Sequence, residues 1–457
     1  MYKRLYRYGF VVYLLLLVFA IVFYVERTIF LDIAYHLFSI VKNNGFAIQA
    51  FRFGAAFTQA FPVAGVKLSL PLESIMLMYS AGFIIYYTAC YWICGSVLKQ
   101  YEIAIVLLLF NIMLVSKTFF WMQAELPQGC AFMLVMFAML KSTALSDKDK
   151  GKLIMLLPVI LMAVSFHPII WIPAFFVIAY FSLNTQYLVD KRLFWAGSIL
   201  FIILFYVKTK VFVNPYDAVA ISQRDNMLRL FPNWINLASN RILLANFLGK
   251  FIWMPVSVLL ISGVYIMQRK WLKLVLVGGA LGSYLLLINT TYPHDNTPEF
   301  YIENLYLPVA LILGLPLVYD VFPVLEKRKL LLPVFLLIIL SGLGRIYMSH
   351  HHYTERVNWE RKFLAQHKDE KLLVAATKPM LDTLTMSWGT PYEFWLLSTT
   401  EHDKTASIVI TDDIEGIEYA HWERMSFVTQ WGVFPYTELP ARYFIFTDTV
   451  NRYRVIK

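Results

Sequence analysis

Long apolar runs separated by polar segments fill the first 350 residues of the chain. A helix that crosses the ~30 Å hydrocarbon core of a bilayer needs about 20 apolar residues. By that measure the pattern predicts an α-helical polytopic membrane protein with about eleven transmembrane helices. The expected spans lie near residues 8–26, 72–95, 102–118, 127–141, 153–166, 169–183, 193–207, 251–267, 272–289, 304–323 and 331–348.

The apolar stretch 153–183 is too long for one span and short for two. Prolines at positions 158, 168 and 173 interrupt it, and His167 lies near its middle. Because proline ends or kinks a helix, the stretch is either a single broken span or a hairpin of two short spans.

The distribution of basic residues favours the hairpin. With the hairpin and a cytoplasmic N-terminus, the inside loops hold 16 Lys and Arg in 46 residues, whereas the outside loops hold 11 in 117. This difference follows the positive-inside rule, so the long and chemically varied loops are expected on the outer face. The inside loops are 1–7, 96–101, 141–152, 184–192, 268–273 and 325–330, and the outside loops are 27–71, 116–126, 165–168, 208–250 and 290–303.

The chain becomes polar after about residue 350. We expect a transmembrane region over 1–349 and a small α/β domain over 350–457, on the outer side of the membrane. Within that domain no Gly-rich phosphate loop or Cys-x-x-Cys motif occurs. A helical pattern covers Asn358–Gln366, and β-type runs cover Lys371–Ala376, Ser407–Thr411, Tyr443–Asp448 and Tyr453–Ile456.

Composition agrees with a membrane protein, since 59% of the residues are hydrophobic and 15% are charged. The formal net charge of +10 does not indicate nucleic-acid binding, because most basic residues stand in short clusters between apolar runs. Cys90 and Cys94 lie four residues apart, a spacing that two metal ligands on one helix face can also have. No His or acid joins them, so we interpret them as core residues and predict no metal site.

Ionisable residues beside apolar spans are candidates for function, because a charge at a membrane surface is costly unless it is compensated. Asp32, in Phe30-Leu31-Asp32-Ile33-Ala34-Tyr35-His36, is the first, and on a helix it shares a face with His36. The alternative is an acid that caps the next helix. Arg52 lies between aromatic residues in the same loop and suits a phosphate, or equally a snorkelling contact with lipid headgroups.

Further candidates lie in the other outer loops. Glu125 is the acid of the turn between the third and fourth spans, and it is either functional or a helix cap. His167 stands at the tip of the hairpin, where it donates to a ligand oxygen or bonds a carbonyl freed by proline. His294 and Asp295 lie in the acidic loop 290–303, which suits carbohydrate hydroxyls or a cation, and equally a plain solvated turn. The two residues alone are too short a pattern for a metal site. The 208–250 loop is expected to be interfacial and partly helical, with charges that hold a lipid phosphate or are solvated: Asp217, Arg224, Asp225, Arg229 and Arg241.

Together these features resemble the C-type glycosyltransferase superfamily of integral membrane enzymes. The resemblance rests on the architecture, on Asp32 shortly after the first span and on a second acid-bearing outer loop. The segment Ser387–Ser398 is also similar to tails of uncharacterised bacterial members. The Asp-x-Asp pair usual in the family is absent, because Ala34 follows Ile33, and this leaves metal dependence open.

The resemblance implies transfer of a sugar from a polyprenyl-phosphate donor to a glycan, lipid or protein acceptor at the outer face of the bacterial inner membrane. The N-terminus would be cytoplasmic and the C-terminal domain periplasmic, with membrane lipid as a further partner and no cofactor. We expect Asp32 to be the general base, Arg52 and His167 to stabilise the leaving phosphate, and Glu125 to be a second catalytic residue that orients the acceptor or shares the role of base.

Two other functions fit the same architecture. A polysaccharide polymerase of the O-antigen type would use basic loop residues, here Arg224, Arg229 and Arg241, and would dispense with Asp32. A lipid or sugar transporter or flippase would place ionisable or Gly-interrupted positions at mid-membrane and show internal repeats. Neither feature is evident, since the polar groups cluster at one face.

Overall fold

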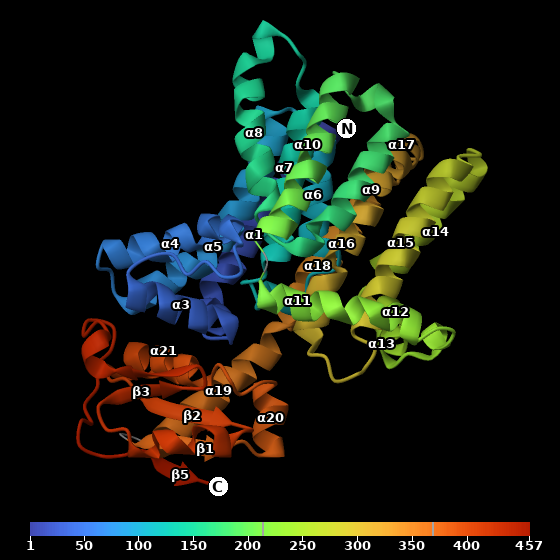
Figure 1. The fold of residues 1–457 in the computed structure, drawn as a ribbon. Helices are drawn as coiled ribbons and strands as arrows, with labels where there is room; N and C mark the ends of the chain where they lie inside the picture. The colour runs from blue at the N-terminus through green and yellow to red at the C-terminus, as the bar shows by residue number, and fades with distance from the viewer. Residues whose placement is uncertain (213, 368–369) are drawn as a thin grey trace.

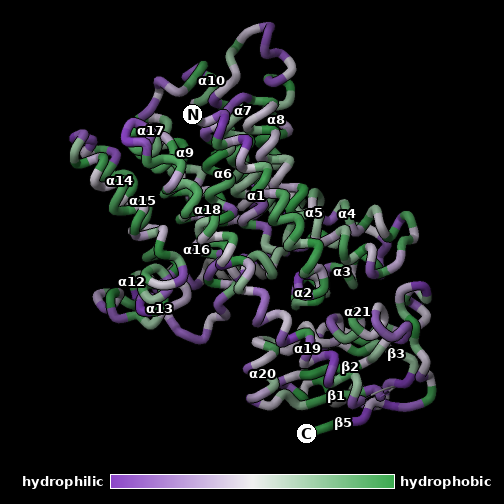
Figure 2. Tube along the Cα trace, turned by 180° about the vertical axis from the view of Figure 1, so that it is seen from behind, coloured by the Kyte–Doolittle hydropathy of each residue, from purple (hydrophilic) through white to green (hydrophobic). Residues whose placement is uncertain are grey.

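The computed structural model describes residues 1–212, 214–367 and 370–457, and it is mostly helical (Figure 1). Apolar residues run along the helices of a bundle (Figure 2). The bundle consists of α1 (Tyr2–Val22), α5 (Leu72–Trp92), α6 (Tyr101–Met113), α7 (Glu125–Ser142), α8 (Lys150–Val164), α9 (Trp171–Ser182), α10 (Lys191–Val211), α14 (Trp253–Met267), α15 (Trp271–Thr291), α16 (Glu299–Pro316), α17 (Phe322–Lys327) and α18 (Leu331–Met348). Shorter helices outside it are α2 (Tyr24–Thr28), α3 (Asp32–Asn43), α4 (Ala56–Lys67), α11 (Pro215–Ser222), α12 (Asn226–Arg229) and α13 (Ala238–Leu248).

Six helices in the described part of the chain are long and apolar enough to cross a membrane, and eight candidate spans result if each of two bent pairs counts as one. The predicted spans outside these six form helices of 12–18 residues. One of them, α6, has 13 residues and lies at the centre of the bundle, where almost every side chain is buried. A helix covered on all sides by protein needs no apolar length matched to lipid, so length and hydropathy alone do not identify it.

The stretch 153–183 folds as two short helices. α8 and α9 meet at an angle of 118°. The break contains Ser165, Phe166 and His167, and Pro168 follows at the start of the next helical turn. Proline lacks the amide hydrogen that continues a helix, which accounts for the break at this position.

The two ends of the bundle differ in character. One end, here called the basic end, carries the N-terminus and the connections α7–α8, α9–α10 and α14–α15 (Figure 1). The opposite end, here called the loop end, carries α3, α4 and the helices α11, α12 and α13, which lie across the foot of the bundle (Figures 1 and 2). The loops rich in Lys and Arg and the long varied loops therefore separate in space as the sequence predicts.

Residues 350–457, here called the C-terminal unit, adjoin the loop end beneath α3 (Figure 1). A parallel sheet of order β2-β1-β5 and an antiparallel hairpin β3-β4 lie within it. β2 is buried throughout and β1 is buried except at its last residue, as expected for parallel strands covered on both faces. Its elements are α19 (His350–Gln366), β1 (Lys371–Ala375), α20 (Lys378–Leu384), α21 (Thr390–His402), β2 (Ser407–Thr411), α22 (Ile414–Ile417), β3 (Ser426–Thr429), β4 (Gly432–Pro435) and β5 (Arg454–Ile456).

Three of the four predicted strands are present, and the predicted strand Tyr443–Asp448 is wrong. This segment makes one backbone hydrogen bond to its neighbour, from the Thr405 amide to the Ile445 carbonyl, and forms no ladder. Its aromatic side chains are used for packing, since Phe444 stacks on Trp395 with ring centroids 4.6 Å apart. The predicted helix Asn358–Gln366 is present as the second half of α19.

The hydrophobic core is continuous from the bundle into the C-terminal unit. Phe38, on α3, stands at the junction and is 2% exposed. Its ring lies 5.0 Å from that of Tyr392 and 5.7 Å from that of Trp395, both on α21. Aromatic packing of this kind holds α3 between the bundle and the C-terminal unit.

Candidate functional site

Asp32 is the first residue of α3 and lies half-buried at the loop end. The indole Nε1 of Trp121 donates a hydrogen bond of 2.8 Å to its Oδ2. Burial raises the pKa of Asp32 to about 6, and the charge of Glu125 raises it further against the lowering effect of the Trp121 bond. Among the described residues no other side chain donates to this carboxylate. Its raised pKa makes Asp32 a stronger base than an ordinary carboxylate, and the oxygen that Trp121 does not bond is left for a ligand.

Arg52 holds together two acidic residues from distant parts of the chain. Its Nη1 lies 2.7 Å from Glu125 Oε2, and its Nη2 lies 2.7 Å from Asp217 Oδ1. Glu125 is the first residue of α7 and Asp217 belongs to α11, so three segments meet here. Burial lowers the pKa of Arg52, but the two carboxylates outweigh burial and the pKa is raised above its ordinary value.

His167 lies beside this cluster, in the break between α8 and α9. The amide of Gly54, two residues after Arg52, donates to the Ser165 carbonyl at 3.5 Å, and Lys208 Nζ donates to the Val164 carbonyl at 2.9 Å. His167 Nδ1 accepts from the Ile169 amide at 3.2 Å. Burial lowers the pKa of His167 well below its ordinary value, and the charges of Arg52 and Lys208 lower it further, so the imidazole is neutral.

His36 is not joined to Asp32, although the two residues are one helical turn apart. Its Nδ1 lies 3.4 Å from Gln59 Nε2 on α4, and Gln59 in turn bonds both backbone groups of Ala47. His36 is 3% exposed, and burial lowers its pKa. The structure therefore places it in the packing of α3 against α4, while Trp121 takes the place beside Asp32.

His294 and Asp295 line a cavity of about 300 Å³ at the loop end, apart from Asp32. That volume is at the lower end of the range for small-molecule sites. The lining is formed by Ser239, Ile242, Asn246, Tyr292, His294, Asp295, Thr297, Glu299, Ile302 and Tyr306. Aromatic side chains connect this cavity to Asp32: the hydroxyls of Tyr292 and Tyr301 are 3.1 Å apart, and the Tyr301 ring lies 5.8 Å from Trp121.

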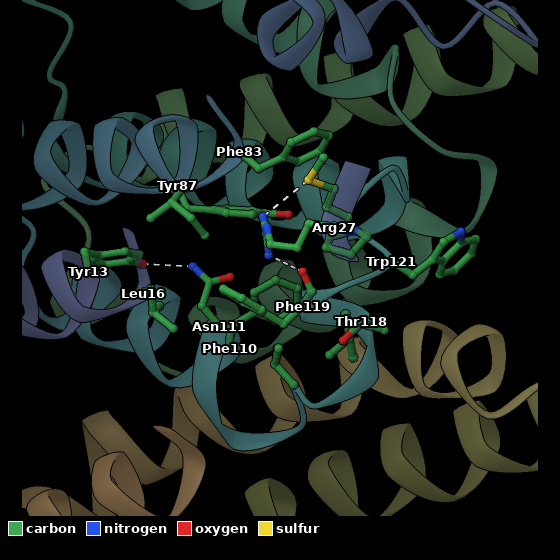
Figure 3. Close-up of a pocket in the computed structure, with 15 residues that line it drawn as sticks. Tyr13, Leu16, Arg27, Phe83, Tyr87, Phe110, Asn111, Thr118, Phe119 and Trp121 are labelled. Carbon is green, nitrogen blue, oxygen red and sulfur yellow. Dashed lines mark hydrogen bonds between the residues drawn. The ribbon is translucent and has the colours of Figure 1, made fainter. Parts of the chain in front are cut away.

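Arg27 anchors the segment that carries Trp121 and Glu125. Its guanidinium donates to the carbonyls of Ser80 and Phe119 and to Ser80 Oγ, and the Phe119 ring centroid is 4.0 Å from its central carbon (Figure 3). Arg27 is 1% exposed and borders a cavity of only about 50 Å³ with mainly apolar walls. We assign it a structural role, because a cavity of this size holds about one water molecule.

Exposed phenylalanines surround the Arg52 cluster. Phe51 and Phe53 flank Arg52 in sequence, and their rings lie 5.3 and 6.4 Å from that of Phe212. Exposed aromatic side chains at the end of a transmembrane bundle are suited to the lipid interface. The group, here called the aromatic rim, consists of Phe51, Phe53, Phe57 and Phe212, which are 39–47% exposed.

Sequence reasoning missed the roles of Trp121, Lys208 and Tyr301. Their residue types gave no signal of their own, although Trp121 stands in the same predicted outer turn as Glu125. Two basic residues of the 208–250 loop lie outside the Arg52 cluster of Arg52, Glu125 and Asp217. Arg229 bonds Asn226, and Arg241 is exposed. The side chain of Arg224 lies outside the described part of the structure.

No family model, curated protein or solved structure matches this chain. Within residues 1–212, 214–367 and 370–457, no three or more His, Cys, Asp and Glu side chains gather closely enough to hold a metal ion. Cys90, Cys94 and Cys130 are buried thiols. The candidate site is therefore described by its own geometry.

Proposed function

We propose that this chain transfers a sugar from a polyprenyl-phosphate donor to an acceptor hydroxyl at the loop end, with Asp32 as the general base. The observation that carries the proposal is the meeting, at one end of a helical bundle, of Asp32, the Arg52 cluster and the aromatic rim. A carboxylate with a raised pKa suits proton transfer from a hydroxyl. Lipid-facing aromatic side chains next to buried charges suit a substrate with a polar head on an apolar chain.

The donor would enter from the membrane past the aromatic rim. Its phosphate would then lie near Arg52, Lys208 and the neutral His167, which supply two positive charges and one imidazole. Arg52 is already paired with two carboxylates, of which the Asp217 side chain is the more exposed, at 20% against 9% for Glu125. We therefore propose that the donor phosphate displaces the Asp217 carboxylate from Arg52 and takes its place.

The acceptor would lie in the cavity that His294 and Asp295 line. Its amide, hydroxyl, imidazole and carboxylate groups suit a polyhydroxylated ligand, and Tyr292 offers a ring for contact with a sugar face. Glu299 at its edge is paired with Lys117 and Lys250 at 2.6 Å, so the lysines offer little net attraction to an anion. A neutral glycan is the acceptor class that this lining favours.

In the reaction, an acceptor hydroxyl would give its proton to the oxygen of Asp32 that Trp121 leaves open. The hydroxyl oxygen would form a bond to the anomeric carbon while the bond from that carbon to the phosphate oxygen breaks. The lipid phosphate would leave with the electron pair, and positive charge near Arg52 would stabilise it. Glu125, held by Arg52, would keep the guanidinium in place.

The proposed topology has eleven crossings, with α6, α7, α8 and α9 among the short ones, and a cytoplasmic N-terminus. The loop end and the C-terminal unit would then face the periplasm of a bacterial inner membrane. The density of Lys and Arg in the loops of the basic end supports this orientation.

The test is transfer from a polyprenyl-phosphate sugar by the purified Asp32→Asn variant. We expect a loss of at least about 100-fold in kcat, because general base catalysis contributes about 100- to 10,000-fold. Asp382→Asn, an exposed acid on α20, is the matched control and should retain full activity. Activity of Asp32→Asn near that of the unaltered protein would remove Asp32 from the mechanism.

A further inference from the structure

The segment Ser387–Ser398 has no part in the reaction proposed above, yet it is almost completely buried, with β2 and α3 both packed against it. It contains the three residues before α21 and most of that helix. Glu393, within it, is 0% exposed, and its Oε1 accepts a hydrogen bond of 2.9 Å from the backbone amide of Leu31. Leu31 directly precedes Asp32, so a residue of the C-terminal unit contacts the backbone that carries the proposed base.

The backbone at Leu31 needs such support. Its φ and ψ angles are 45° and −112°, a region that residues with a side chain rarely adopt. A conformation of this kind persists only where the surroundings hold it. Leu31 is also the N-cap residue of α3, and Asp32 is the first residue of that helix. The backbone angles of Leu31 therefore set the orientation of the Asp32 side chain.

Arg356 on α19 fixes Glu393 in turn. Its Nη2 and Nε both bond Glu393 Oε2, the latter at 3.0 Å, and its central carbon lies 5.1 Å from the centroid of the Phe30 ring. Both charged side chains are buried, and Arg356 compensates the charge of Glu393 while it also lies 3.2 Å from the buried Glu360. Glu393 therefore has one oxygen tied to the C-terminal unit and the other tied to Leu31.

Gly389 brings the two backbones close together. A Cβ atom at this position would lie 2.8 Å from Leu31 Cα and 2.7 Å from Glu393 Oε1, closer than real Cβ atoms approach their neighbours. The absence of a side chain at position 389 therefore permits the hydrogen bond between Glu393 and Leu31.

We propose that the C-terminal unit acts as a positioning element for Asp32, with Glu393 as the positioning residue that acts through the Leu31 amide. This inference rests on the proposed function, because it gives the C-terminal unit a role in catalysis only if Asp32 is the base. The unit makes no contact with the reacting atoms in this scheme. It keeps the Asp32 carboxylate beside Trp121.

The main test is Gly389→Ala, which displaces Leu31 without removing a charge. We expect kcat to fall at least tenfold with the donor KM unchanged. Amide hydrogen exchange in a peptide spanning Leu31 should become at least tenfold faster in the full-length protein. Gly432→Ala is the matched control in the same unit, because the nearest atom to its Cβ would be 3.4 Å away, an ordinary contact. This control should keep kcat within twofold.

A second pair of variants separates the hydrogen bond from the fold. Glu393→Gln keeps an oxygen for the Leu31 amide, whereas Glu393→Leu does not, so exchange at Leu31 should be faster in the Leu variant than in the Gln variant. Equal exchange rates at Leu31 in the unaltered protein, Gly389→Ala and Glu393→Leu, or an unchanged kcat in both variants, would overturn the inference. Exchange tests the positioning directly, while activity of Asp32→Asn tests the proposed function, so the two failures are distinguishable.

Discussion

At the scale of single residues, the sequence predicts which ionisable side chains belong to the site but not which residues they contact. Asp32 and Arg52 attract notice because each is an ionisable residue beside apolar sequence. Their partners, Trp121 and Asp217, lie 89 and 165 residues away in the chain. Local spacing predicted His36 as the partner of Asp32, but helix packing turns His36 towards Gln59.

The raised pKa of Asp32 predicts an acidic limb in the pH profile. A general base is active when deprotonated, so kcat/KM should be level above the pKa and fall about tenfold per pH unit below it. With the Asp32 pKa at about 6, half of the maximal value is expected near pH 6. If the acidic limb lay near pH 4, where an exposed carboxylate titrates, the pKa of the general base would not be raised by burial, and the prediction would be wrong.

Asp217 and the donor phosphate are expected to compete for Arg52. In Asp217→Asn the guanidinium keeps Glu125 and loses one anionic partner, so the donor KM should fall about threefold to tenfold while kcat stays unchanged. The measurement is donor saturation kinetics at fixed acceptor concentration. Asp225→Asn, which changes an exposed acid of the same 208–250 loop, serves as the control. A higher donor KM in Asp217→Asn would place the phosphate elsewhere.

At the scale of elements, periodicity and the length of apolar runs predict the positions of most helices. They do not predict the length of a helix that is buried on all sides, such as α6. Predicted spans such as 331–348 and 272–289 correspond closely to α18 and α15. The strands β1, β2 and β5 were foreseeable from short β-branched and apolar runs between turns. The sequence does not predict the hairpin β3-β4. It predicts a strand over Tyr443–Asp448 that does not form, because an aromatic run that packs without pairing has the same composition as a strand.

The anchoring of the 118–125 segment by Arg27 predicts a loss of stability in Arg27→Met. The buried Phe119 carbonyl would lose the donor that Arg27 supplies, at a cost of about 1–3 kcal/mol, and the Arg27 bond to the Ser80 carbonyl of α5 would also be lost. Thermal unfolding in detergent, followed by tryptophan fluorescence, should show a Tm lower by several degrees, and transfer should weaken because Trp121 and Glu125 follow in this segment. Arg4→Met, an exposed arginine on α1, is the control. Equal Tm values for the two variants would contradict the anchoring role.

At the scale of the whole molecule, charge predicts the arrangement better than length does. The loops with 16 basic residues lie at the basic end, and the longer loops lie at the opposite end with the C-terminal unit (Figure 1). The docking of that unit on α3 could not be foreseen, because it depends on shape complementarity between Gly389 and Leu31 and on a buried ion pair. Neither leaves a periodic signal in the sequence.

The proposed orientation can be tested by labelling single introduced cysteines from outside the membrane. Ser146 is exposed at the basic end and Thr449 is exposed on the C-terminal unit, while the native Cys90, Cys94 and Cys130 are buried and should react little. In spheroplasts, a membrane-impermeant maleimide should label Thr449→Cys, and should label Ser146→Cys only after permeabilisation. The positive-inside rule requires this result, because the loops dense in Lys and Arg stay in the cytoplasm. The reverse pattern would place Asp32 on the cytoplasmic side and would contradict a reaction at the outer face of the membrane.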